Sequence, residues 1–142
     1  YASVYRAASG KAGDMNRYAV FLNLDERVEI CAQHWRNSMR AVQEDREKVS
    51  HFTHLRFEDV LENPWESVQE LCAFLKLPFR EDLLPHLDHE FPLGSRYRDR
   101  WYPLRPEVNQ PYLESIPKKY VALIDEHCQP LAEKWGYVSP AR

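Results

Sequence analysis

The chain has 142 residues, of which 44% are hydrophobic and 29% charged, and its formal net charge is −3. This composition is typical of one globular domain, and its slight acidity argues against a general nucleic-acid binder, which is usually basic. No apolar run approaches the roughly 20 residues that a membrane-spanning helix needs, and the N-terminus does not resemble a signal peptide. The three cysteines lie far apart on predicted apolar helix faces, which favours free thiols and a cytoplasmic location. They are Cys31, Cys72 and Cys128.

The first two predicted helices lie in the opening third of the chain. Tyr1–Ala8 reads as the middle of a helix without a cap or an initiator methionine, so we expect the chain to be a piece of a longer protein. That helix should end in the flexible stretch 9–13. Asn23 is expected to cap the second helix together with Glu26. Apolar residues then recur at helical spacing and predict an inward stripe. The stripe comprises Val28, Cys31, Ala32, Trp35, Met39 and Val42.

A strand followed by a helix is the clearest unit in the middle of the chain. Alternating side chains predict a strand over 52–57, the one convincing strand in the sequence. Asn63 as cap, Pro64 at the first helical position and Glu66 for a capping box predict a helix over 63–77. Its expected apolar face comprises Val68, Leu71, Cys72 and Leu75. A lone strand leaves both its edges unpaired, so it predicts partner strands elsewhere.

Two further helices are predicted in the second half. The first is short and spans about 81–87, and the second is long and spans about 117–135. Pro130 lies inside the long helix and lacks the N–H that would bond back to Glu126, so we expect a kink or break there. Gly136 supplies the stop after it.

An arginine-rich segment, residues 94–105, stands out by charge. It contains four arginines and one aspartate, which give a local charge of +3 in an acidic chain. The planar guanidinium group binds phosphate or sulfate oxygens bidentately, so the segment is a candidate anion site. The alternative is a solvated loop whose arginines pair with carboxylates on neighbouring helices.

No catalytic or metal-binding set is visible in the sequence. Histidine pairs such as His86 and His89 lack a third or fourth ligand at a recognisable distance, so we predict no metal. The chain has no Gly-x-Ser-x-Gly elbow, no P-loop and no Rossmann glycine pattern. The catalytic residues are therefore unknown at this stage.

Several segments together resemble the carboxyl-terminal half of a known family. The run Leu55-Arg56-Phe57-Glu58-Asp59-Val60, then Asn63-Pro64, and the helix that ends in Leu77-Pro78 are similar to a segment of bacterial-type sulfotransferases. These enzymes use 3′-phosphoadenosine-5′-phosphosulfate. Ser3 takes the place of the serine in the family's 3′-phosphate motif, and Arg100-Trp101 is similar to the loop that closes over the nucleotide. Lys134-Trp135-Gly136-Tyr137 resembles a common bacterial ending.

The resemblance implies a P-loop-kinase-like α/β fold built on a parallel sheet. Residues 1–142 would form a single, incomplete domain, mostly helical, with the partner strands of 52–57 in a missing N-terminal half. It also implies transfer of a sulfuryl group to a hydroxyl or amine of a small-molecule, glycan or peptide acceptor, without a metal or nucleic acid. The family's phosphosulfate loop, catalytic lysine and histidine base precede Ser3, so this chain alone is expected to be inactive.

The resemblance also implies a set of nucleotide-binding residues. Ser3 and one of Arg96, Arg98 and Arg100 would hold the 3′-phosphate, and which arginine does so stays open. Phe57 stands where many members have a tyrosine against the adenine, which keeps ring stacking but removes a hydroxyl.

Two other functional classes remain open at the level of sequence. One is a nucleotide phosphotransferase of the P-loop-kinase superfamily, which an upstream Gly-x-x-x-x-Gly-Lys-Ser/Thr loop would favour. The other is a non-enzymatic helical interaction module, which absence of nucleotide binding by the folded full-length protein would favour.

Overall fold

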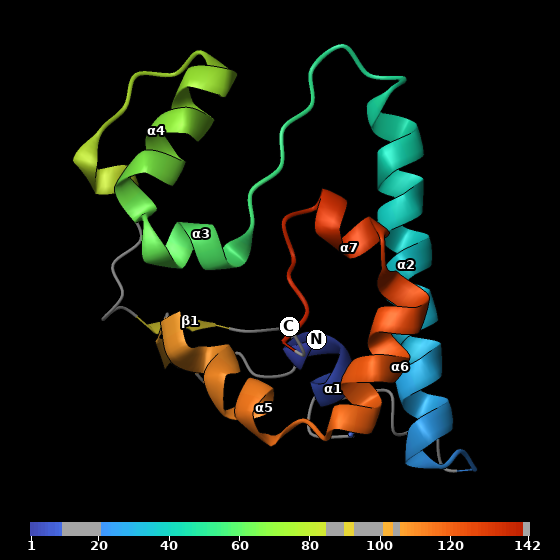
Figure 1. Ribbon diagram of the computed structural model, residues 1–142. Helices are drawn as coiled ribbons and strands as arrows, with labels where there is room; N and C mark the ends of the chain where they lie inside the picture. The colour runs from blue at the N-terminus through green and yellow to red at the C-terminus, as the bar shows by residue number, and fades with distance from the viewer. Residues whose placement is uncertain (10–20, 85–89, 93–100, 104–105, 141–142) are drawn as a thin grey trace. The chain divides into compact units, whose positions relative to one another are not determined.

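The computed structural model describes residues 1–9, 21–84, 90–92, 101–103 and 106–140 (Figure 1). The chain divides into two units. The first consists of residues 1–50 and 109–142, and the second consists of residues 51–108. None of the described helices is both long enough and apolar enough to cross a membrane.

The first unit is a cluster of helices around α2. It contains α1 (Ala2–Ala8), α2 (Leu24–Arg46), α5 (Gln110–Ser115), α6 (Lys118–Cys128) and α7 (Leu131–Lys134). The short α1 and the longer α6 both pack on α2. Val28 of α2 and Ile124 of α6 are the largest side chains that are almost completely buried. The core of this unit therefore lies where these two helices meet.

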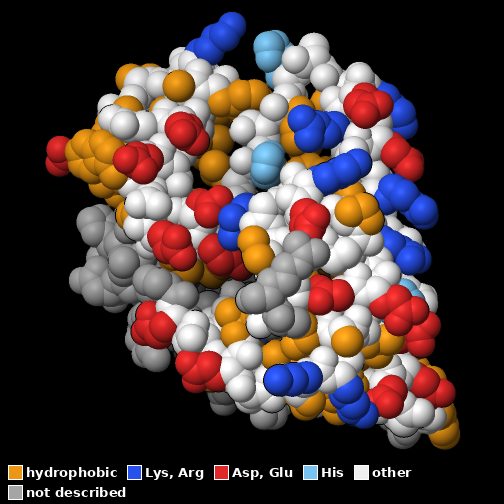
Figure 2. Space-filling model, viewed as in Figure 1, with side chains coloured by type: hydrophobic (Ala, Val, Ile, Leu, Met, Phe, Trp, Pro, Cys, Tyr) orange, Lys and Arg blue, Asp and Glu red, His pale blue; other side chains and the backbone are white. Residues whose placement is uncertain are grey.

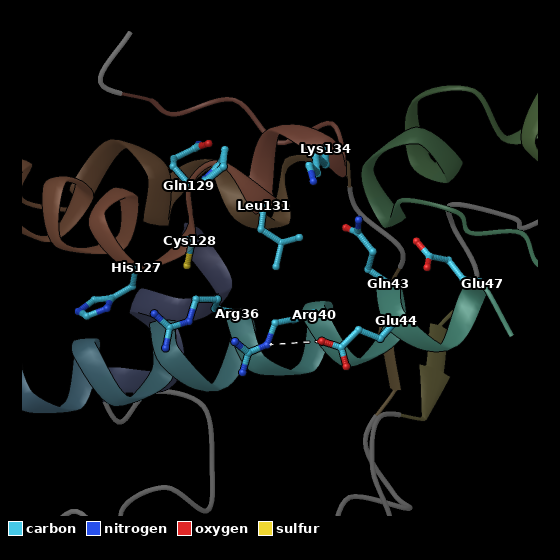
Figure 3. Close-up of a pocket in the computed structure, with 11 residues that line it drawn as sticks. Arg36, Arg40, Gln43, Glu44, Glu47, His127, Cys128, Gln129, Leu131 and Lys134 are labelled. Carbon is cyan, nitrogen blue, oxygen red and sulfur yellow. Dashed lines mark ion pairs between the residues drawn. The ribbon is translucent and has the colours of Figure 1, made fainter.

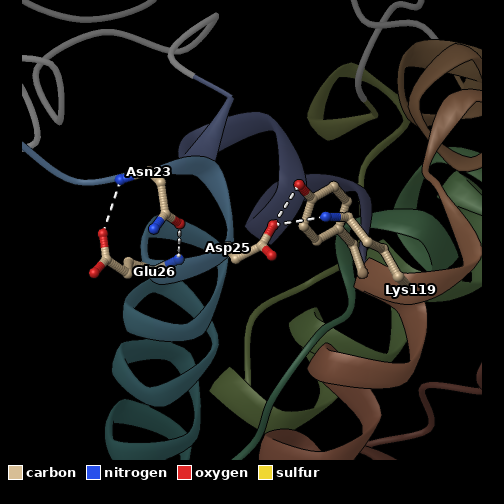
Figure 4. Close-up of polar contacts among 5 residues, drawn as sticks. Asn23, Asp25, Glu26 and Lys119 are labelled. Atoms are coloured by element: carbon tan, nitrogen blue, oxygen red, sulfur yellow. Dashed lines mark hydrogen bonds and ion pairs between the residues drawn. The ribbon is translucent and has the colours of Figure 1, made fainter.

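The start of α2 agrees with the sequence prediction. The Asn23 side chain accepts a hydrogen bond from the backbone N–H of Glu26 at 3.0 Å, and the Glu26 carboxylate accepts one from the N–H of Asn23 at 2.8 Å (Figure 4). The predicted capping box is thus confirmed. The inward stripe is confirmed for Val28 but wrong for Val42, which is 39% exposed, because the described core follows α2 only as far as Trp35.

Asn23→Ala should destabilise the first turn of α2 by about 1 kcal/mol, because it removes the side-chain oxygen that accepts the hydrogen bond from the Glu26 N–H. Amide hydrogen exchange should show faster exchange at Glu26 and its neighbours. Asn63→Ala is the matched control, because the Asn63 side chain makes no capping hydrogen bond to α4. Equal changes in exchange at the two helix starts would contradict this explanation.

The break in the last long helix is also confirmed. Helix α6 ends at Cys128 and α7 begins at Leu131, with Pro130 between them. The N–H of Gln129 donates to the carbonyl of Asp125 at 2.9 Å, and Pro130 has no N–H with which to continue the pattern. Gly136 has a φ of 78°, a left-handed conformation that lets the N–H of Tyr137 donate back to Ala132.

In its described residues, the second unit contains two α-helices and a pair of short strands. Helix α3 spans Phe57–Glu62, α4 spans Pro64–Leu75, and a 3-10 turn covers Glu81–Leu83. Strands β1 (Glu90–Pro92) and β2 (Trp101–Pro103) pair antiparallel. A second 3-10 turn, Pro106–Asn109, runs from this unit into the first. Of the predicted helix 81–87, the described residues form only the 3-10 turn over Glu81–Leu83. Residues 85–87 lie outside the described residues.

The predicted strand over 52–57 is wrong. Residues 52–56 form neither helix nor strand, and Phe57 is the first residue of α3. Arg56 keeps an extended backbone, with φ −82° and ψ 137°. A strand is stabilised by hydrogen bonds to a neighbouring strand, and no other described segment pairs with 52–56. The sheet of the described residues is the two-stranded β1–β2 pair, so the parallel sheet implied by the resemblance is not seen within them.

Helix α4 follows its predicted pattern in part. Pro64 occupies the first turn as expected, but Asn63 makes no side-chain cap and the capping box with Glu66 is not formed. Asn63 also ends α3, where its N–H donates to Asp59 at 2.8 Å, so its backbone is not free to adopt the usual capping geometry. Instead, the buried hydroxyl of Ser67 donates to the carbonyl of Asp59 at 3.3 Å and ties α4 to α3.

The predicted apolar face of α4 is only partly covered. Cys72 is buried, but Leu75 is 51% exposed. Other large apolar side chains of this unit are also exposed, and hydrophobic side chains are visible at the surface in Figure 2. These include Trp65, Phe74 and Leu77. The described residues therefore leave several large apolar side chains of this unit only partly covered.

Candidate functional site

Helix α1 presents Ser3 to the surface. Ala2, Val4 and Ala8 are buried, and α1 packs against α2. Ser3 is exposed, and its hydroxyl makes no hydrogen bond to another described residue. A serine hydroxyl can donate one hydrogen bond and accept two. This one is therefore available to a ligand.

Arg6 lies one helical turn after Ser3 and on the same side of α1, because residues i and i+3 are neighbours on a helix. Its guanidinium carbon lies 5.8 Å from the centre of the Tyr112 ring on α5. Its Nε is buried and has no hydrogen-bond acceptor among the described residues, and it makes no ion pair within them. Ser3 thus has an uncompensated positive charge beside it. Sequence reasoning missed Arg6, although its helical spacing from Ser3 was visible.

A pocket of about 430 Å³ lies between α1 and α5 and includes the Tyr112 ring that Arg6 contacts. It is lined by Tyr5, Ser9, Pro111, Tyr112 and Ser115. The hydroxyl of Ser9 donates to the carbonyl of Arg6 at 3.1 Å. Two tyrosine rings and two serine hydroxyls give the pocket apolar walls with polar groups at its edges.

Helix α1 is held in place by a hydrogen-bonded group around Asp125. The Tyr1 and Ser139 hydroxyls both donate to the Asp125 carboxylate, Ser139 at 2.7 Å, and Gln129 donates to the Tyr1 oxygen at 3.1 Å. Burial raises the pKa of Tyr1 and the bond to Asp125 raises it further, so the phenol stays protonated as a donor at neutral pH. These bonds fix the beginning of α1, two residues from Ser3.

A second contact group joins α2 to α6 near α1 (Figure 4). Asp25 accepts hydrogen bonds from the Lys119 ammonium at 2.8 Å and from the Tyr120 hydroxyl at 2.7 Å. These two bonds lower the pKa of Asp25. The Tyr120 ring lies 5.5 Å from the Tyr5 ring of α1, so Asp25 orients an aromatic side chain that supports α1.

Phe57 lies in the second unit, where it begins α3. Its side chain is 48% exposed, which leaves a ring face open to a flat ligand. The neighbouring Arg56 pairs with Asp59 at 3.5 Å across the first turn of α3. Ser3 and Phe57 belong to different units, so the structure gives the two positions separately.

The three candidate arginines, Arg96, Arg98 and Arg100, lie outside the described residues. The chain on either side of them is described. Pro92 of β1 stands opposite Trp101 of β2 in the antiparallel pair. The sequence analysis did not predict this pairing.

The cysteines show no metal-binding arrangement in the described part of the chain. Cys31, Cys72 and Cys128 are buried free thiols. No group of three or more histidine, cysteine or acidic side chains among the described residues could hold a metal ion. Burial raises the pKa of Cys31, and it raises that of Cys128 to about 11, so both remain protonated at neutral pH.

A comparison with protein families matched the chain to the model of one family. The model described as "Sulfotransferase family" matches residues 2–81, which is more than half of the 142 residues. The chain belongs to the sulfotransferase family. The part of this sulfotransferase that matches runs from α1 through α4 and includes Ser3 and Phe57, whereas 93–100 follow it. No curated protein and no solved structure matched the chain.

Proposed function

We propose that this chain carries part of the nucleotide site of an enzyme that transfers a sulfuryl group from 3′-phosphoadenosine-5′-phosphosulfate to a hydroxyl or amine. The observation that carries the proposal is the family match over residues 2–81, within which Ser3 is exposed on α1. The nucleotide is a co-substrate here, and no metal is required for its recognition.

The 3′-phosphate would be held at Ser3. The Ser3 hydroxyl would donate one hydrogen bond to a phosphate oxygen, and Arg6 would supply a nearby positive charge that has no ion pair among the described residues. One or more of Arg96, Arg98 and Arg100 would also bind this phosphate. Guanidinium groups suit this role because they bind phosphate oxygens through paired, charge-assisted hydrogen bonds.

The adenine would stack on Phe57. Its ring is about half exposed at the start of α3, and an aromatic face binds a purine through offset stacking. A phenylalanine gives no hydroxyl, so the base would be read by its flat face rather than by a hydrogen bond at this position.

These residues would act on the leaving nucleotide during transfer. In the reaction the bond between sulfur and the bridging phosphate oxygen breaks, and a bond from sulfur to the acceptor oxygen or nitrogen forms. The acceptor loses its proton. The nucleotide keeps the electron pair of the broken sulfur–oxygen bond and leaves as adenosine 3′,5′-bisphosphate. Ser3, Arg6 and the loop arginines would fix the nucleotide so that the sulfuryl group is aligned for attack. The catalytic base is not assigned.

Calorimetric titration with adenosine 3′,5′-bisphosphate tests the proposal. Arg98→Ala or Arg100→Ala should weaken binding by about tenfold or more, because each removes a charge-assisted contact of roughly 1.5–3 kcal/mol. Arg80→Ala is the matched control, since Arg80 is exposed and bonds only to Asp82 among described residues. Loop variants that bind as tightly as the Arg80 control would contradict the role of the loop.

A further inference from the structure

A second pocket lies within the first unit, between α2 and the turn from α6 into α7 (Figure 3). Its volume is about 390 Å³, which is in the range of pockets that bind small molecules. It is lined by Arg36, Arg40, Gln43, Glu44, Glu47, His127, Cys128, Gln129, Pro130, Leu131 and Lys134. One of these residues, Gln129, also donates to the Tyr1 hydroxyl at the start of α1, and none of them lines the pocket between α1 and α5.

Arg36 is the least compensated charge in this pocket. It is half-buried, its Nε is buried without an acceptor among the described residues, and it forms no ion pair with them. Glu29, two turns before Arg36 on α2, already pairs with His127 at 3.6 Å and accepts a hydrogen bond from Gln33 at 3.0 Å. An anion in the pocket would pair with this guanidinium group, whose charge has no ion pair among the described residues.

Arg40 brings a second guanidinium group to the same wall. It follows Arg36 by four residues, so the two side chains are neighbours on α2, as Figure 3 shows. Its ion pair with Glu44 is 4.0 Å long between side chains that are 64% and 65% exposed, which makes it weak. Two neighbouring guanidinium groups repel each other, and an anion placed between them would relieve that repulsion.

The opposite wall is partly apolar, and His127, Gln129 and Lys134 line the pocket beside its apolar side chains. Leu131 of α7 and the sulfur of Cys128 point toward α2 in Figure 3. The pKa of Cys128 is raised by burial to about 11, so the thiol adds no negative charge that would repel an anion. Glu44 and Glu47 lie further along α2, at the other end of the pocket. The pocket therefore places the two guanidinium groups opposite apolar side chains, while Glu44, Glu47 and Lys134 also line it.

We propose that this pocket binds a small organic phosphate monoester. The phosphate lies against Arg36 and Arg40, and the organic part lies against Leu131 and Cys128. A phosphate monoester carries a charge of about −1.5 to −2 near pH 7, which matches two guanidinium groups. Its organic part is small and apolar, because the acids at the far end disfavour a second negative group. The proposal does not depend on the nucleotide site at Ser3.

Titration of the full chain with phenyl phosphate and with inorganic phosphate, followed by amide NMR spectra, tests this assignment. Phenyl phosphate should bind saturably and more tightly than inorganic phosphate, and it should shift the resonances of α2 and α7. Arg36→Gln and the exposed Arg40→Gln should each weaken phenyl phosphate binding by about tenfold. Lys48→Gln removes the same charge at the end of α2, outside the pocket, and should bind as the unchanged chain does, as should Ser3→Ala.

Three results would overturn the proposal. One is the absence of saturable binding of phenyl phosphate by the unchanged chain. Another is that Arg36→Gln and Arg40→Gln both bind phenyl phosphate as tightly as the unchanged chain, while their spectra show that both variants are folded. The third is an equal loss of affinity in Lys48→Gln, which would mean general attraction of anions to the helix.

Discussion

Ile124→Ala should lower the free energy of unfolding of the first unit by about 2–5 kcal/mol, because it removes a large side chain from a packed core. Ile124 is 2% exposed and lies where α6 meets α2, opposite the fully buried Val28. The surrounding helices relax only partly into the space that is left, so the cavity adds to the lost burial. Urea unfolding monitored by the amide resonances of α2 and α6 measures the change.

Ile30→Ala provides the matched control on α2. It removes the same atoms from a side chain that is 42% exposed, so its cost should be well under half that of Ile124→Ala. Similar losses for the two variants would mean that the α2–α6 contact is not the core of this unit.

Ser3→Ala should weaken the binding of adenosine 3′,5′-bisphosphate by about tenfold or more, because a hydrogen bond to a charged phosphate contributes roughly 1.5–3 kcal/mol. Ser3 is exposed on α1 and its hydroxyl has no partner among the described residues, so the substitution should leave the fold unchanged. Calorimetry gives the affinity, and the amide spectrum reports on the fold.

Ser9→Ala is the control for this substitution. It deletes the same hydroxyl just beyond the end of the same helix, where the hydroxyl donates to the carbonyl of Arg6 rather than pointing to a ligand. Its effect on the affinity should be small. If Ser9→Ala weakens binding as much as Ser3→Ala does, the effect comes from the helix as a whole and not from a phosphate contact.

The helices of the first unit could be predicted because their signals are local. The capping box at Asn23, the break at Pro130 and the left-handed Gly136 each depend on residues within one or two turns. The strand over 52–57 could not be predicted correctly, since a strand requires a partner and pairing is not encoded in the alternation of one segment. Asn63 failed as a cap because it closes α3 and opens α4 at once.

Part of the candidate site could also be predicted from the sequence. Family resemblance led to Ser3 and Phe57, and both are exposed. The position of Arg6 over the Tyr112 ring was not predictable, because it depends on α5 packing beside α1. The same holds for the pocket beside Arg36, whose walls come from segments far apart in the sequence. Arg96, Arg98 and Arg100 remain predictions, as they lie outside the described residues.

The most direct test of a 3′-phosphate site is a comparison of two ligands on the unchanged chain. Adenosine 3′,5′-bisphosphate and adenosine 5′-monophosphate share the base, the ribose and the 5′-phosphate, and differ in the 3′-phosphate alone. Calorimetry should show at least about tenfold tighter binding of the bisphosphate, because the 3′-phosphate adds charge-assisted hydrogen bonds. Equal affinity for the two nucleotides, or binding of neither, would contradict the proposal that this sulfotransferase holds the nucleotide at Ser3.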